Sequence, residues 1–342
     1  MKAMVLQQLC SLDQNQLPLA LMNLPVPEPR KNDILVRVSA CGVCHTELDE
    51  IEGRTPPPRL PIVPGHQAVG LVAAVGSSAS RFKIGDRVGI AWIYSACGSC
   101  ASCLEGNENL CHEFVATGRD VDGGYAQYMT VTEAFAHRIP VGLQDIEAAP
   151  LLCAGAIGYR SLKLTGLTDG QNMGLSGFGG SGHLVLKMVK YRYPNTQIFV
   201  FARSESERAF ALELGANWSG DVTENAPEKL HCVIDTTPAW KPIVSSLRNL
   251  LPGGRLVINA IRKEDRDKDY LMELDYPEHL WMEKEIKSVA NVSREDVSEF
   301  LSLAADIGIK PEIQTYPLAE ANRALVDLST KAVKGAKVLV VD

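Results

Sequence analysis

The chain has 342 residues, of which 46% are hydrophobic and 22% are charged, and its formal net charge is −7. This length suffices for about two domains, and the composition is typical of a soluble globular protein, which excludes an extended disordered chain. The acidic balance, without a cluster of Lys and Arg, argues against a nucleic-acid-binding surface. No apolar window of about 18 residues and no signal segment stand out, so we expect no membrane contact and a cytoplasmic protein with reduced thiols.

The first 150 residues predict a β-rich domain, because short alternating apolar stretches are separated by Gly and Pro. The clearest predicted strands are residues 34–40, 68–75 and 87–91.

From about residue 169, apolar strands alternate with amphipathic helices, an order typical of a parallel sheet. The predicted strands are residues 172–176, 197–201, 232–235 and, after a Pro-Gly-Gly turn at 252–254, 255–260. The predicted helices are residues 181–189, 205–214 and 240–250. A helix at 294–307 and a strand at 337–341 are too short to form a further domain, and we expect them to return to the first one.

A pattern C-x2-C-x2-C-x7-C is formed by four cysteines, Cys97, Cys100, Cys103 and Cys111. This spacing brings four thiolates around one Zn²⁺ within a single surface lobe. A disulfide is the alternative, but cysteines this close in sequence seldom suit separate bridges. Because four sulfur ligands leave the metal no open position, this zinc is expected to stabilise the loop and to take no part in catalysis.

Cys44, His66 and Cys153 are candidates for a second zinc site. Cys44 and His66 are expected to end apolar strands near glycines that permit tight turns, and Cys153 lies far downstream at the domain junction. Two thiolates and one imidazole are a known catalytic zinc set that leaves one position for water or a substrate oxygen. Taken singly, each residue is more often a buried Cys or a hydrogen-bonded His than a ligand.

Around these residues the sequence resembles the zinc-containing medium-chain alcohol dehydrogenases, over nearly its whole length. The segments that carry the resemblance are Gly42-Val43-Cys44-His45-Thr46, Gly65-His66-Gln67-Ala68-Val69-Gly70, Gly85-Asp86-Arg87-Val88 and Leu151-Leu152-Cys153-Ala154-Gly155. The four-cysteine lobe is similar to the structural zinc loop of that family.

The resemblance implies roles for individual residues. Cys44, His66 and Cys153 would hold the catalytic zinc, and Thr46 would contact the oxygen of the alcohol. A hydroxyl two residues from Cys44 can also pass a proton outward. His45 would contact the cofactor phosphates. Trp92 would narrow the substrate pocket, for which packing in the core is an equal alternative.

The resemblance also implies an α/β fold with two domains. A GroES-like β-rich catalytic domain would span residues 1–151 and be completed by 289–342, and a Rossmann domain with a doubly wound parallel sheet would span 152–288. Zinc and cofactor would lie where the two domains meet, and the protein would form a homodimer or homotetramer.

Three residues depart from the pattern of the family. Glu47 stands where the family usually has Asp, and its carboxylate can still partner the zinc or His66. Asp49 stands where many members have the His that ends a proton relay, so solvent or another route is expected to carry the proton. Gln67 replaces a Glu, which makes the zinc site less negative.

A G-x-G-x-x-G motif follows the predicted strand 172–176 and precedes the next helix, as dinucleotide binding requires. Its glycines serve a tight turn, close approach of the pyrophosphate and close helix packing, with the helix N-terminus facing the phosphates. Thr236, at the end of a later strand, is expected to contact the nicotinamide ribose, although an ordinary strand-end loop is an equal alternative. The residues of the motif expected to bind cofactor are Gly177, Gly179, Gly180, Ser181 and Gly182.

The sequence after the strand at 197–201 predicts a preference for NADP(H) over NAD(H). An NAD enzyme normally places Asp or Glu there, whereas this chain has Ala202-Arg203-Ser204. Arg203, Ser204 and Arg208 could bind a 2′-phosphate through charge-assisted hydrogen bonds. The alternative is a solvated arginine at a helix start, with Glu205 and Glu207 beside it.

Together these observations predict an enzyme with two zinc ions per chain that interconverts small alcohols with aldehydes or ketones by hydride transfer to and from a nicotinamide. One alternative is a zinc-free quinone or enone reductase on the same fold. Another is a non-catalytic nucleotide-binding redox or metal sensor, which the residues Glu47, Asp49 and Gln67 make conceivable.

Overall fold

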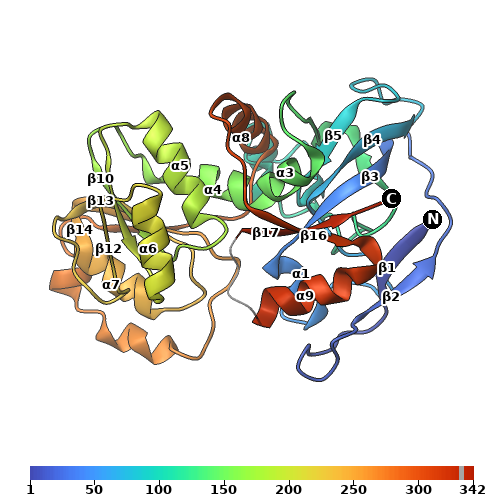
Figure 1. The fold of residues 1–342 in the computed structure, drawn as a ribbon. Coiled ribbons are helices and arrows are strands. Elements are labelled where there is room, and N and C mark those ends of the chain that lie inside the picture. The colour runs from blue at the N-terminus through green and yellow to red at the C-terminus, as the bar shows by residue number, and fades with distance from the viewer. Residues whose placement is uncertain (331–334) are drawn as a thin grey trace. The chain divides into compact units, whose positions relative to one another are not determined.

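The computed structural model describes residues 1–330 and 335–342, and the chain divides into two units (Figure 1). The first comprises Met1–Ala156 and Val292–Asp342, and the second comprises Ile157–Asn291. We call them the β-rich unit and the nucleotide unit. Within the described residues, every helix is too short or too polar to cross a bilayer.

A seven-stranded sheet lies at the centre of the β-rich unit, in the order β16-β17-β3-β4-β5-β9 with β8 also paired to β3. β17 runs antiparallel to β3, so the last strand of the chain belongs to the same sheet as strands from its first 150 residues. Two further strand pairs are β1–β2 and β6–β7. The strands are β1 (Lys2–Leu6), β2 (Leu19–Asn23), β3 (Asp33–Val43), β4 (Ala68–Val75), β5 (Arg87–Ile90), β6 (Ile93–Ser95), β7 (Val115–Ala116), β8 (Tyr128–Thr132), β9 (Ala136–Arg138), β16 (Ile313–Pro317) and β17 (Ala336–Val340).

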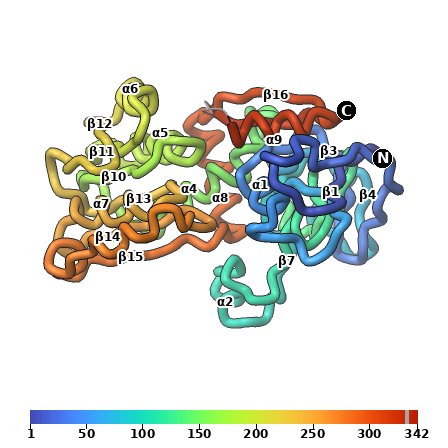
Figure 2. Tube along the Cα trace, turned by 90° about the horizontal axis from the view of Figure 1, so that it is seen from below, coloured from blue at the N-terminus to red at the C-terminus, as the bar shows by residue number. Residues whose placement is uncertain are grey.

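The β-rich unit also contains helices, some of which pack on this sheet and some of which carry parts of the candidate sites. They are α1 (His45–Ile51), α2 (Ala101–Leu104), α3 (Asp145–Pro150), α8 (Arg294–Asp306) and α9 (Ala321–Thr330). Figure 2 shows the segment around α2 projecting from the β-rich unit beyond β7. α8 shows why the sequence forms a helix here: the Ser293 side chain accepts the N–H of Asp296 at its start, and Gly308 follows its end with a positive φ of 65°.

The nucleotide unit contains a six-stranded parallel sheet in the order β12-β11-β10-β13-β14-β15, which confirms the predicted fold class. Residues 255–258 of the strand predicted at 255–260 pair with β13 and β15, but β14 begins already at Leu250, so the expectation of a separate turn at 252–254 is wrong. The strand instead runs through Gly253, which has a φ of 71°, and the pairing with β13 shifts register between Leu230 and Cys232. The strands are β10 (Asn172–Ser176), β11 (Gln197–Phe201), β12 (Trp218–Gly220), β13 (Leu230–Asp235), β14 (Leu250–Ile258) and β15 (Glu285–Ser288).

Helices surround these parallel strands, as Figure 1 shows for α5, α6 and α7. The helices of this unit are α4 (Ala156–Thr165), α5 (Gly182–Arg192), α6 (Glu205–Glu213) and α7 (Lys241–Asn249). Ile243 and Leu247 of α7 are buried against Phe199 of β11 and Val233 of β13. Because these strands are continuously apolar in sequence, helices must pack against them to keep them from water.

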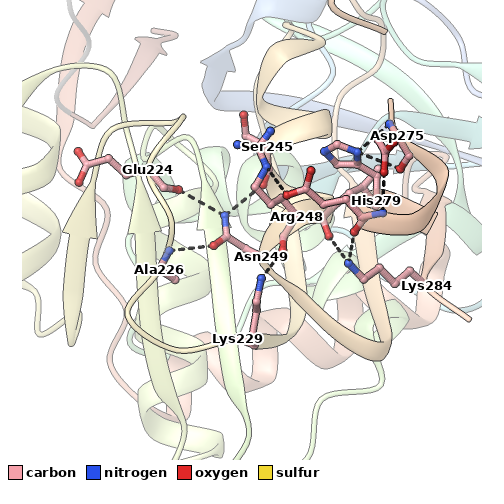
Figure 3. Close-up of polar contacts among 11 residues, drawn as sticks. Glu224, Ala226, Lys229, Ser245, Arg248, Asn249, Asp275, His279 and Lys284 are labelled. Atoms are coloured by element: carbon pink, nitrogen blue, oxygen red, sulfur yellow. Dashed lines mark hydrogen bonds and ion pairs between the residues drawn. The ribbon is translucent and has the colours of Figure 1, made fainter. Parts of the chain in front are cut away.

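The C-terminus of α7 is held by two lysines (Figure 3). Lys229 Nζ donates to the carbonyl of Arg248 at 2.7 Å, and Lys284 Nζ donates to that of Leu247 at 2.8 Å and to that of Glu278 at 2.7 Å. Two of these carbonyls belong to the end of α7, where cations and donors are favourable. Both lysines lie at the amino ends of strands, Lys229 before β13 and Lys284 before β15.

His137 of β9 is buried in the β-rich unit, with Nδ1 3.1 Å from the hydroxyl of Ser298. Burial, together with the charges of Arg81 and Arg294, lowers the pKa of His137 to about 3. The folded chain therefore holds this imidazole neutral, whereas the unfolded chain protonates it near its ordinary pKa of about 6.5. Stability from this difference is fully present above the unfolded pKa and is lost as the pH falls toward the folded one.

We therefore expect His137→Asn to reduce the loss of stability on acidification. Between pH 7 and pH 5.5 the wild-type histidine should cost about 1 kcal/mol, because only the unfolded chain takes up the proton. The Tm of the variant should accordingly fall less over this interval than that of the wild type. His112→Asn is the control, since the His112 side chain is 78% exposed. Equal falls in all three proteins would contradict the prediction.

Candidate metal centres and cofactor site

Three segments of the β-rich unit bring Cys44, His66 and Cys153 together. Cys44 follows β3 and precedes α1, His66 lies just before β4, and Cys153 lies in a π-helical turn at Leu151–Gly155. One ligand atom from each lies within 4.8 Å of the others. The expectation that His66 ends a strand is wrong, because its segment begins one: Gln67 pairs with Gly42 through a 3.0 Å hydrogen bond, and β4 follows.

The sulfur geometry fits a bound zinc. Cys44 Sγ and Cys153 Sγ are 4.0 Å apart, and all nine cysteines are free thiols. Tetrahedral zinc with Zn–S bonds of about 2.3 Å needs sulfurs about 3.8 Å apart, whereas a disulfide needs about 2 Å. The contact between the two sulfurs lowers the pKa of Cys44 well below its ordinary value and raises that of Cys153. One thiol of the pair is thus prepared to be a thiolate ligand.

Glu47 orients the imidazole of His66. Its Oε1 lies 2.5 Å from His66 Nδ1, and its Oε2 accepts the backbone N–H of Cys44 at 2.8 Å. Both side chains are almost completely buried, at 0% exposed for Glu47 and 1% for His66. The contact with Glu47 uses Nδ1 of His66, so Nε2 of the ring is available for a metal. One carboxylate therefore positions two of the three candidate ligands, His66 and Cys44.

Thr46 and Asp49 occupy the same short helix with different surroundings. Thr46 Oγ1 lies 3.7 Å from Cys44 Sγ, so its hydroxyl is adjacent to the candidate ligands. Asp49 is buried and forms an ion pair with Arg54, with Nε 2.5 Å from Oδ1. The sequence did not predict this partner, which fixes the direction of the Asp49 carboxylate.

Glu50 is a second buried carboxylate near the site that the sequence analysis missed. It is 2% exposed, and neither of its side-chain oxygens has a hydrogen-bond partner among the described residues. Burial and the neighbouring Glu47 raise the pKa of Glu50 well above its usual range. The sequence could have indicated that Glu50 lies near Glu47, because residues three apart lie on one face of a helix.

The four cysteines of the lobe also gather around one point. All four sulfurs lie within 4.8 Å of one another, and those of Cys97 and Cys103 are 3.9 Å apart. Backbone N–H groups of Ser99 and Cys100 lower the pKa of Cys97 to about 6. This arrangement fits a closed four-sulfur zinc site. The lobe that carries it consists of residues 97–111, including α2.

The glycine motif of the nucleotide unit forms a tight turn whose first and last glycines lie in close contact. Gly177 has a φ of 82°, and a side chain at Gly182 would meet the carbonyl oxygen of Gly177 at 2.7 Å. A Cβ atom added at Gly179 or Gly180 would meet no described atom within 4 Å beyond the neighbouring residues of the chain. Ser181 immediately precedes α5. The loop therefore offers an open backbone surface at a helix N-terminus, where a pyrophosphate can bind.

The end of β11 carries the residues expected to bind a 2′-phosphate. Arg203 is exposed, and Ser204 is the N-cap of α6, accepting the N–H of Glu207. Arg208 points back to the chain instead, donating to the carbonyls of Ala202 and Arg203 at 2.9 Å each. Arg208 thus stabilises the backbone of the loop, whereas the side chain of Arg203 is exposed on the loop's surface.

Thr236 packs directly on the glycine motif. Its N–H donates to the carbonyl of Ser176 at 2.8 Å, and a side chain at Gly177 would meet Thr236 Oγ1 at 2.6 Å. Asp235, the residue before Thr236, forms a buried ion pair with Lys263. No sequence motif pointed to this lysine. No local pattern identifies such a lysine, because it lies in the loop after β14 and its partner is at the end of β13.

Trp92 and His45 are the remaining predicted site residues, and both lie in the β-rich unit. Trp92 is half-buried between two neighbours, with its ring centroid 5.2 Å from that of Phe114 and 5.3 Å from the guanidinium carbon of Arg119. His45 is exposed at the first position of α1. Trp92 thus packs on the core while remaining partly accessible.

Comparison with known proteins gives a consistent set of relatives. Residues 30–141 match the alcohol dehydrogenase GroES-like domain. A probable alcohol dehydrogenase, AdhA, of Mycobacterium tuberculosis (strain CDC 1551 / Oshkosh) is 42% identical over 95% of this chain and 93% of the relative. An alcohol dehydrogenase of Geobacillus stearothermophilus is 32% identical over 97% of this chain and 98% of the relative.

Solved structures show the same architecture. A cinnamyl alcohol dehydrogenase of Sorghum bicolor superposes with a TM-score of 0.84 at 27% identity, covering 99% of this chain and 97% of that one. A Helicobacter pylori protein, described as CAD complexed with NADP(H), superposes with a TM-score of 0.85 at 23% identity, covering 99% of this chain and 97% of that one.

The contact between Glu47 and His66 predicts how tightly the metal binds. Glu47→Gln keeps the shape but removes the charge that orients the imidazole, so zinc affinity at this site should fall about 10- to 100-fold. Competition with a chromophoric chelator would measure it, and zinc in the four-cysteine lobe should be retained. Glu52→Gln, at the end of the same helix, is the control. Unchanged affinity in the Glu47 variant would show that this carboxylate does not support the metal.

Proposed function

We propose that this chain, which belongs to the medium-chain alcohol dehydrogenase family, uses a catalytic zinc and prefers NADP(H). Its alcohol dehydrogenase function follows from the family. We propose small alcohols, aldehydes and ketones as its substrate class. The observation that carries the zinc proposal is the convergence of two sulfurs and one imidazole within 4.8 Å. We further propose a cytoplasmic homodimer or homotetramer, as the resemblance implies.

In this proposal Cys44, His66 and Cys153 hold one zinc, and the four cysteines of the lobe hold another. The catalytic metal, when bound, supplies Lewis acidity that polarises the oxygen of an alcohol or carbonyl. The protein contributes the orientation of the ligands. Glu47 fixes the ring of His66 and the backbone of Cys44, and the contact of the two sulfurs favours the thiolate.

Thr46 is the proposed proton carrier at the reacting oxygen. Its hydroxyl lies 3.7 Å from Cys44 Sγ, and a hydroxyl can accept one proton while it donates another. Asp49 forms an ion pair with Arg54, so we do not propose it as the outer end of a proton relay. We propose instead that the proton passes from Thr46 to solvent, since Thr46 is half-buried and therefore accessible.

The cofactor is proposed to bind along the carboxyl edge of the parallel sheet, with its pyrophosphate on the loop from Gly177 to Gly182. A nicotinamide dinucleotide supplies the acceptor or donor of the hydride. Support for NADP(H) comes from the end of β11, where an exposed Arg203 stands in place of the acid that NAD enzymes use. Arg203 and the hydroxyl of Ser204 would bind the 2′-phosphate.

Zinc analysis combined with activity tests this proposal. We expect about two zinc ions per chain and NADP⁺ reduction with a panel of small alcohols. Cys153→Ser should lose one zinc and reduce kcat/KM at least about 100-fold, because the Lewis acid is lost. Cys111→Ser, the matched control in the lobe, should lose the other zinc and lower the Tm.

Two outcomes would overturn the zinc assignment. Full activity of the Cys153 variant toward quinones or enones would indicate a zinc-free reductase. Two zincs with nucleotide binding, but without turnover of any alcohol or carbonyl, would indicate a sensor.

Arg203→Asp tests the cofactor preference separately. Loss of the cation and gain of an anion should lower kcat/KM for NADP⁺ about 10- to 100-fold and improve that for NAD⁺. Arg30→Asp makes the same change of charge at an exposed position of the β-rich unit and should alter neither. A clear preference of the wild type for NAD⁺ would contradict the NADP(H) proposal.

A further inference from the structure

A buried lysine links two loops at the carboxyl edge of the parallel sheet. Lys263, in the loop after β14, has a side chain only 8% exposed, and its Nζ lies 2.5 Å from Oδ2 of Asp235, which is 0% exposed. The same Nζ donates to the carbonyls of Thr237 at 2.7 Å and Ala239 at 3.1 Å. An ammonium has three protons, and each of them here has an acceptor.

The partners of Lys263 lie at the end of β13 and in the turn that follows it. Asp235 ends β13, and Oδ1 of its carboxylate accepts the hydroxyl of Thr237 at 2.8 Å. A further hydrogen bond joins the two loops, from the N–H of Glu264 to the carbonyl of Pro238 at 2.7 Å. The turn from Thr236 to Ala239 is therefore fixed at several consecutive residues from the neighbouring loop.

This turn lies against the glycine motif. The hydroxyl of Thr236 donates toward the carbonyls of Ser176 at 3.2 Å and Gly177 at 3.3 Å. A side chain at Gly177 would meet Thr236 Oγ1 at 2.6 Å and Thr237 Cγ2 at 2.9 Å. A continuous series of contacts thus runs from Lys263 through Asp235 and the Thr236–Thr237 pair to the first glycine of the motif.

The free-energy cost of burying Lys263 and Asp235 bears on the role of their ion pair. Removing two charges from water is expensive, and well-packed apolar side chains often stabilise a core as well as a buried ion pair does. An ion pair with hydrogen bonds, by contrast, fixes the direction of each partner. The sheet edge where it lies, at the carboxyl ends of β10, β13 and β14, is where ligands bind in open α/β folds.

We propose that Lys263 is a positioning residue for the dinucleotide, which holds the Thr236–Ala239 turn in the shape that receives the nicotinamide half. This inference rests on the proposed function, in which Arg203 and Ser204 bind the other half, at the adenosine 2′-phosphate. Lys263 itself acts through Asp235 and the turn. Its loss should therefore affect one half of the cofactor and spare the other.

Binding of two probes to the full-length protein tests this inference. One is NADP⁺, and the other is adenosine 2′,5′-bisphosphate, which has the 2′-phosphate but lacks the nicotinamide. Lys263→Met should weaken NADP⁺ about tenfold or more by calorimetry, equivalent to about 1.4 kcal/mol, and change the bisphosphate less than about twofold. Asp235→Asn should have the same pattern, which guards against a single variant that fails to fold.

Lys284→Met is the matched control. Lys284 also donates to two backbone carbonyls of this unit, but at the amino ends of the strands (Figure 3). It should leave the affinity for both probes unchanged, even if the Tm falls. Lys263→Arg, which keeps the charge, should recover part of the affinity for NADP⁺.

The outcomes separate the two proposals. If the wild type binds neither probe, the proposed cofactor is wrong. If Lys263→Met weakens both probes equally, or leaves NADP⁺ binding unchanged while the wild type binds both, the cofactor stands and the positioning role of Lys263 is wrong.

Discussion

The candidate catalytic centre depends on the antiparallel pairing of β3 with β4. In this register Cys41 lies opposite Ala68, so the end of β3 and the start of β4 are neighbours. Cys44 and His66 lie just beyond these two ends, which brings residues 22 positions apart in sequence to one point. Glu47 then fixes both of them, because it follows Cys44 in the first turn of α1. A slip of one residue in the register would turn every side chain of a strand to the other face.

The third candidate ligand, Cys153, is held by a different contact. Phe300 of α8 lies so close to Gly155 that a side chain there would meet its ring at 2.1 Å, and Gly155 ends the π-helical turn that carries Cys153. The first residue of the same helix, Arg294, binds the buried Glu108 of the lobe through its N–H at 2.7 Å and its Nε at 2.8 Å. α8 thus joins the four-cysteine lobe to the turn of Cys153. A metal bound by the lobe would therefore also support the position of α8.

The sequence predicted those parts of the molecule in which local pattern and chemistry coincide. Residues 68–75 and 172–176 form strands β4 and β10 with the expected limits, because apolar runs end there at Gly or polar residues. The cysteines of the lobe gather because their spacing suits a single metal. The glycine motif adopts its turn because only glycine accepts the φ of Gly177 and the contact at Gly182.

Other features could not be read from the sequence, since they depend on contacts between distant segments or on small backbone differences. Five residues, Leu151–Gly155, are too few to distinguish a π-helix from an α-helix by periodicity. The Pro-Gly-Gly segment within β14 indicates a turn by composition, but the strand continues through it as an irregularity between the pairs Leu230–Leu250 and Cys232–Arg255. Arg208 stays a predicted phosphate ligand, but the sequence could not show that its Nη1 donates to the carbonyls of Ala202 and Arg203. The role of Lys263 depends on its contact with Asp235 at the end of β13, which is distant in sequence.

The most direct test of the account is a crystal structure with anomalous diffraction data collected on both sides of the zinc edge. The account predicts two peaks per chain, one in the lobe and one bound by Cys44, His66 and Cys153, at about 2.3 Å from each sulfur and about 2.0 Å from the imidazole nitrogen. The second zinc should keep one coordination position that no protein atom occupies. A peak in the lobe alone, in crystals grown with excess zinc, would contradict the central claim.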